Sequence, residues 1–78
     1  MKIHVTAEHI KNGRRCDGDL CAVALALDEA TGHDWSVKGS KAFNLTTQRV
    51  FYFDRQVIRF IAAFDFGQPV CPFEFDLS

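Results

Sequence analysis

Apolar and polar residues alternate in three short stretches of the chain, which is the pattern of a half-buried β-strand. These stretches cover residues 2–5, 35–38 and 73–77. Residues 41–53 form a longer apolar region with a polar interruption near residues 46–48, which predicts a hairpin of two strands. Residues 50–53 are apolar on both sides of the second strand, so the pattern leaves the register of this hairpin open.

Two further stretches near the N-terminus have the signals of helices. We expect a short helix over residues 7–11, capped by Thr6 and ended by the Asn12-Gly13 pair. A second helix is expected from about residue 20 to residue 31. Asp17 or Asp19 would cap it, and Gly32 would stop it.

The strongest helical pattern begins after Asp54, which is expected to cap it, and ends before Gly67. Its apolar residues recur at helical spacing and predict one buried side. They are Val57, Ile58, Ile61 and Phe64, with Phe60 beside them.

The order of these elements is β-α-α-β-β-β-α-β, which predicts an α+β fold. We expect a small, largely antiparallel sheet with the helices packed on one of its faces. The 78 residues predict a single domain, residues 1–78. Apolar residues make up 47% of the chain and eight residues are phenylalanine, so a core is expected without metal or disulfide staples.

The charge balance narrows the range of partners. Nine basic residues stand against ten acidic ones, a net charge of −1, and this disfavours general nucleic-acid binding. The longest apolar run, residues 20–27, is too short to span a bilayer. The N-terminus lacks the apolar segment of a secretory signal, so we expect a cytoplasmic protein with no membrane partner.

No residue pattern predicts an enzyme, a cofactor or a metal. Cys16 and Cys21 lack the close spacing of a zinc knuckle, and Cys21 falls on an apolar helix, where we expect a core residue. The three histidines, His4, His9 and His33, are expected in solvent rather than beside a nucleophile.

Aromatic residues are expected mostly in the core, because a small domain needs them there. Tyr52 and Trp35 are the best candidates for partly exposed rings. A base-stacking platform is disfavoured, because Tyr52 and its neighbours are followed by Asp54 and lack the glycine and basic residues of such a signature.

Several segments resemble small, functionally uncharacterised proteins of tailed phages and prophages. The shared stretches are Val5-Thr6-Ala7-Glu8-His9-Ile10, the helix from Cys21 to Leu27, Phe60-Ile61-Ala62-Ala63-Phe64-Asp65-Phe66-Gly67 and Pro69-Val70-Cys71-Pro72-Phe73. Ala22 departs from the pattern, which usually has proline there. The resemblance implies a phage origin, and small phage proteins of this kind include anti-CRISPR inhibitors, such as those of type I effector complexes.

The leading hypothesis is therefore a non-enzymatic binding protein that inhibits a host defence complex by occupying a surface, for example a basic nucleic-acid groove. The partner would be a host protein or ribonucleoprotein, with no direct nucleic-acid contact, and the chain would be a monomer or weak homodimer. The expected contact residues are Asp28, Glu29, Asp65, Glu74 and Asp76. The alternative is a small DNA-binding regulator that uses Arg14, Arg15, Arg55 and Arg59.

Overall fold

The computed structural model describes residues 1–77 and confirms the α+β class and the order of the elements. The strands are β1 (Lys2–Val5), β2 (Trp35–Lys38), β3 (Lys41–Asn44), β4 (Arg49–Tyr52) and β5 (Phe73–Asp76), and the helices are α1 (Ala7–Asn12), α2 (Ala22–Thr31) and α3 (Arg55–Asp65). All the strand pairs are antiparallel.

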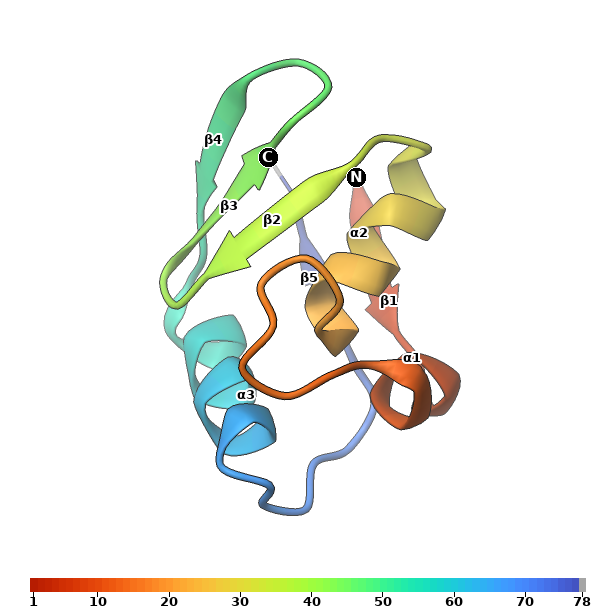
Figure 1. Cartoon of the computed structure of the whole chain (residues 1–78), viewed down its shortest axis with the longest axis vertical. Helices are drawn as coiled ribbons and strands as arrows, with labels where there is room; N and C mark the ends of the chain where they lie inside the picture. The colour runs from red at the N-terminus through yellow and green to blue at the C-terminus, as the bar shows by residue number, and fades with distance from the viewer. Residues whose placement is uncertain (78) are drawn as a thin grey trace.

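The strands form two sheets instead of the one sheet that was expected. β1 pairs with β5, while β2, β3 and β4 form a meander in that order (Figure 1). Aromatic rings occupy the space between β4 and β5: Phe53 meets Phe75 edge to face with their centroids 5.8 Å apart. At this point the two sheets are joined by side-chain packing rather than by backbone hydrogen bonds between strands.

The helix α2 lies between the two sheets and packs against β1, β2 and α1. Its buried residues are Ala22, Val23, Ala24, Ala26 and Leu27. The three alanines carry small side chains, so backbones can approach this helix closely. Ile3 and Val5 from β1 join the same core, together with Trp35 and Val37 from β2.

The start of α2 differs from the prediction. The helix begins at Ala22 with Cys21 as its N-cap, and no side chain caps it. The carboxylate of Asp17 instead accepts from the N–H groups of Asp19 and Leu20, which holds a separate turn before the helix. The end agrees with the prediction, because Gly32 closes the helix with a φ of 73°.

The helix α3 buries Val57, Ile61 and Phe64 against this core, and Asp54 caps it through the N–H of Val57. Ile58 turns outward, and Phe60 is only partly buried. The structure also corrects the prediction for Trp35, which is 2% exposed. Its indole N–H donates to Thr31 Oγ1 at 2.8 Å, so the ring can be buried with its polar group satisfied.

The two edges of the three-stranded sheet differ. On β2, the N–H of Trp35 donates to the Asp28 carboxylate at 3.0 Å, and the N–H of Val37 donates to the Gly18 carbonyl at 2.7 Å. Both donors that point away from β3 are therefore occupied. Among residues 1–77, no strand pairs with the outer edge of β4.

Candidate functional site

The five carboxylates expected to contact a partner lie in three places. Asp28 and Glu29 belong to α2, Asp65 is the last residue of α3, and Glu74 and Asp76 belong to β5. Four of the five make hydrogen bonds or ion pairs within the chain. Their first role is therefore in the fold.

Asp28 connects α2 to the first residue of β2 through its hydrogen bond with the Trp35 N–H. Burial raises the pKa of this carboxyl, and the nearby charges of Asp34 and Asp19 add to the rise, while the Trp35 hydrogen bond opposes it. Burial and the neighbouring negative charges disfavour the charged form of Asp28. The hydrogen bond that joins α2 to β2 is therefore made by a carboxylate whose ionisation costs free energy at neutral pH.

Glu29 binds His9, and this pair corrects the prediction that His9 is solvated. His9 is only 7% exposed, and its Nε2 lies 2.8 Å from the Glu29 carboxylate. Its Nδ1 accepts from the Thr6 N–H at 3.0 Å, while the Thr6 hydroxyl accepts from the His9 N–H at 3.3 Å. The imidazole thus takes the place that Glu or Gln has in a capping box.

Thr6, His9 and Glu29 are the residue types of a catalytic triad, but their hydrogen bonds do not allow His9 to act as the base. A base must offer a free lone pair to the nucleophile's proton. The lone pair of Nδ1 already accepts a backbone N–H, so Nε2 carries the ring proton and donates it to Glu29. The group therefore closes the start of α1 and attaches it to α2.

Asp65 holds the loop that precedes α2. Its carboxylate accepts from the Cys16 N–H at 2.9 Å, and Cys16 has a φ of 56°. Burial raises the pKa of the neighbouring Cys21 thiol, and this disfavours the reactive thiolate. Within the described chain, residues 1–77, no cluster of three potential ligands around these cysteines could hold a metal ion.

Glu74 and Asp76 lie on the outer side of the β1–β5 sheet, directly across from His4 and Lys2. Glu74 pairs with Lys2 at 3.5 Å and with His4 Nδ1 at 3.2 Å. Acidic and basic residues therefore face each other in both rows of this sheet.

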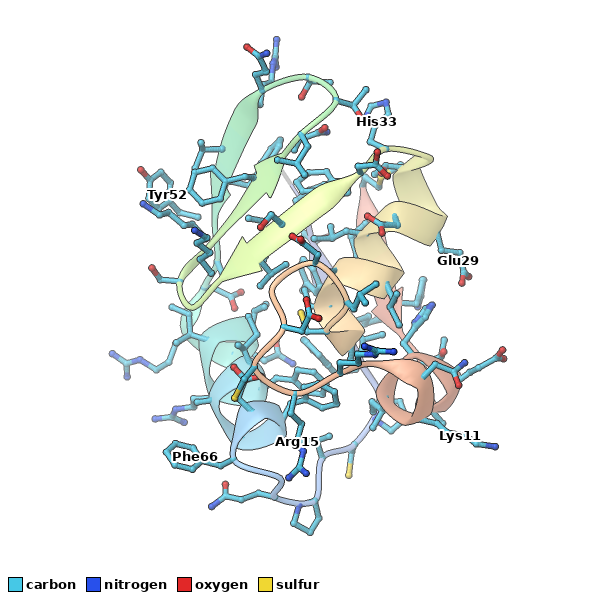
Figure 2. All side chains as sticks on the ribbon, in the orientation of Figure 1. Lys11, Arg15, Glu29, His33, Tyr52 and Phe66 are labelled. Atoms are coloured by element: carbon cyan, nitrogen blue, oxygen red, sulfur yellow. The ribbon has the colours of Figure 1, made fainter. Side chains whose placement is uncertain are left out.

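The four arginines of the alternative hypothesis are also divided. Arg14 and Arg15 lie in the loop before α2, and the Arg15 guanidinium rests against Gly67, just beyond the C-terminal end of α3 (Figure 2). A cation at this end of a helix is favourable. Arg55 and Arg59 are one turn apart on the exposed side of α3.

A different surface becomes visible once the register of the hairpin is known. On the meander, Ser36, Phe43 and Val50 form one cross-strand row, and Lys38, Lys41 and Tyr52 form the next. These six side chains point away from the side that carries Trp35, Val37 and Ala42 into the core. We call them the open sheet face.

The six residues of the open sheet face combine apolar side chains with two lysines and include no carboxylate. Tyr52 is 78% exposed and Val50 is 42% exposed, and both are large apolar residues on a solvent side. Lys38 and Lys41 are directly opposite each other, and like charges at this spacing destabilise a sheet. The Lys41 ammonium lies over the Phe43 ring at 5.3 Å from its centroid.

No carboxylate belongs to the two rows of the open sheet face. The nearest acidic residues along the chain, Asp34 and Asp54, stand at the ends of β2 and β4, and the Asp54 carboxylate is used as the cap of α3. This surface can therefore bind an anionic group with no acidic side chain competing from within the rows.

The prediction that Tyr52 is exposed is confirmed, but the open sheet face was not predicted. A base-stacking platform was disfavoured because the residues next to Tyr52 in the sequence include no basic partner, whereas the two lysines come from β2 and β3. The alternation of Ser36 and Lys38 with Trp35 and Val37 was the available signal. It needed the hairpin register to show which residues lie beside Tyr52.

Comparisons with known proteins give no family for this chain. No protein-family model matches it, and neither a curated protein nor a solved structure is significantly similar. The resemblance to phage proteins therefore stays a prediction. In the part of the chain that the structure describes, no helix has the length and apolar character needed to cross a membrane.

Proposed function

We propose that the chain is a non-enzymatic binding protein and that it contacts its partner through the open sheet face. One observation carries this proposal: the exposed ring of Tyr52 shares a row with two lysines that face each other across the strands. Solvent-exposed sheet faces are usually polar with mixed charge, and this one is apolar with charge of one sign.

The energetics of this face favour an anionic partner. Folding alone places Lys38 opposite Lys41 at some cost, and an anion bound between the two ammonium groups removes that repulsion. Burying Tyr52 and Val50 under the partner adds apolar contact area, and tyrosine is a residue type enriched at binding hot spots.

The exposed side of α3 extends this surface. α3 begins three residues after Tyr52, and its exposed residues include Arg55, Arg59 and Ile58. Figure 2 shows Tyr52 and Phe66 projecting from the same side of the molecule, one from the sheet and one from the end of α3. Two of the arginines of the alternative hypothesis thus lie on the helix that follows this row.

Inhibition of a host defence complex stays a prediction about the identity of the partner. Its expected contact residues, the five carboxylates, offer a weaker surface than the open sheet face because most of them are paired within the fold. A partner bound by the five carboxylates would be basic, whereas a partner bound by the open sheet face would be anionic.

Site-specific photocrosslinking tests the proposal. A benzoylphenylalanine residue placed at Tyr52 should crosslink to a partner in the cells from which the chain comes. The control carries the same group at Lys11, which projects from the opposite side of the molecule (Figure 2). A crosslinked product at Tyr52 but not at Lys11 is expected, and products at Lys11 alone, or at neither position, would contradict the proposal.

A further inference from the structure

We infer that the partner of the open sheet face is a single-stranded nucleic acid. This inference rests on the proposed function and names the partner's chemistry. A single strand offers two repeating groups, flat bases and anionic phosphates, and proteins bind them with aromatic platforms beside basic residues. The row formed by Lys38, Lys41 and Tyr52 provides both within one line across three strands.

Tyr52 is the stacking platform in this arrangement. Its side chain is 78% exposed, so a base can cover the ring without displacing any part of the core. Residues directly opposite on neighbouring strands have Cβ atoms about 5 Å apart, so Lys41 stands beside the ring. A phosphate flanking the stacked base is then within reach of the ammonium groups of Lys41 and Lys38.

Phe43 supplies a second, more sheltered ring in the adjacent row. It lies diagonally from Tyr52 in the register, and the Lys41 ammonium rests over it. Phosphate binding to that ammonium uncovers the Phe43 ring for the next base. The aromatic and cationic groups therefore respond to the same ligand.

Duplex DNA fits this surface less well than a single strand does. Its bases are already stacked on one another, so the Tyr52 ring would have no base to receive. The meander has four residues in each strand and presents its broad face, whereas major-groove readers insert a helix or a two-stranded ribbon. An acidic protein would neutralise the lysines but offers no repeated flat group for the ring.

The net charge of −1 does not oppose this inference, because none of the ten acidic residues lies in β2, β3 or β4. Carboxylates stand only at the rim of the open sheet face, where Asp17 and Asp65 line a cavity with Lys38, and Asp54 and Asp76 line another with Tyr52. Local charge sets the attraction at contact distances, because the Debye length at physiological salt is about 8 Å.

Fluorescence anisotropy with labelled homopolymers tests the inference. The probes are a single-stranded thymidine oligomer and a uridine oligomer of about 12 nucleotides, within the range that small domains cover. A duplex of the same length and a poly-glutamate peptide complete the set. We expect the purified chain to bind the single strands, to bind the duplex at least about tenfold more weakly, and to lose affinity as salt rises from about 50 to about 200 mM.

Variants assign the binding to the face. Tyr52→Ala should weaken binding of the thymidine oligomer by about tenfold or more, while Tyr52→Phe keeps the ring and should stay within about twofold of wild type. The double variant Lys38→Ala/Lys41→Ala should lower the slope of log affinity against log salt by about 1.4, which corresponds to two phosphate contacts. Lys11→Ala removes a cation from the opposite side of the molecule and should leave both quantities unchanged.

The outcomes separate this inference from the proposed function. Absence of binding to either single strand, or equal loss in Tyr52→Ala and Tyr52→Phe, overturns the inference. Binding of poly-glutamate alone, with loss in the lysine variant, overturns it too but leaves the binding face in place. The crosslinked product at Tyr52 gives an independent decision, because nuclease digestion shortens a nucleic-acid adduct and leaves a protein adduct unchanged.

Discussion

The outer faces of the two sheets carry charge in opposite ways. On the β1–β5 sheet each cross-strand row joins a basic residue to an acidic one, Lys2 with Asp76 and His4 with Glu74. On the meander the corresponding row joins Lys38 to Lys41 and continues to an exposed tyrosine. Both faces are on the solvent side of antiparallel strands, so burial does not account for the difference.

The contrast between the two sheets shows which charge pattern is expected on a sheet face whose only role is to stabilise the fold. Opposite charges across a strand pair contribute a small stabilisation, and they leave no net attraction for a partner. The meander gives up that stabilisation, because its two lysines have no carboxylate opposite them and the Tyr52 ring stays exposed. A surface that the fold does not need in this form is therefore a guide to function.

The largest expected effect comes from the core that both sheets share. Phe64→Ala should lower the free energy of unfolding by about 3–5 kcal/mol, because the ring fills a packed site and leaves a cavity. Urea denaturation measures this effect. Phe66→Ala is the matched control: that ring is 83% exposed, and its loss should change stability by at most about 0.5 kcal/mol. Equal effects of the two changes would mean that α3 packs a different side against the core.

A medium effect is expected where α2 holds the meander. Asp28→Ala should cost about 1–3 kcal/mol, because the Trp35 N–H loses its acceptor at a buried position. Asp28→Asn keeps an oxygen there and should retain most of the stability. If the alanine and asparagine variants unfold at the same urea concentration, the hydrogen bond does not hold β2.

The pH dependence of the same pair sharpens this prediction. The pKa of Asp28 is raised in the folded protein, so the folded state holds the proton more tightly than the unfolded state does. The stability gained from protonation is present below the ordinary pKa and is lost as pH rises through the raised pKa. Asp28→Asn lacks this loss. Its stability relative to wild type should therefore rise as the pH increases from the ordinary Asp pKa, about 4, through the raised pKa of Asp28.

The smallest effects are expected from two substitutions that exchange the charge patterns of the two sheet faces. Lys38→Glu places opposite charges across β2 and β3 and should stabilise the chain by about 0.2–1 kcal/mol while weakening binding to the thymidine oligomer. Glu74→Lys creates like charges beside Lys2 and should destabilise by a similar amount, with oligomer binding kept. Thermal unfolding and anisotropy on the same samples compare the two. A Lys38→Glu variant that binds as wild type would remove the distinction between the faces.

Local patterns were sufficient to predict most elements of this fold. Alternation and caps predicted β1, β2 and α3 closely, since each lies beside its own start or stop signal. Two sheets instead of one, and the burial of Trp35 and His9, depend on contacts between distant segments. Trp35 needs Thr31 for its indole N–H, and His9 needs Glu29 from another helix. The open sheet face depends in the same way on a register that alternation alone could not choose.

The edge of β2 has a consequence for self-assembly. Sheets polymerise when each added strand exposes a new edge like the one it covered. Here the outward N–H groups of Trp35 and Val37 are already occupied, so that edge has no free donor to offer. Two copies joined through β4 would end in a closed β2 edge on both sides. Growth would stop at a six-stranded pair, because the loop that carries Gly18 occupies the β2 edge where a further strand would have to add.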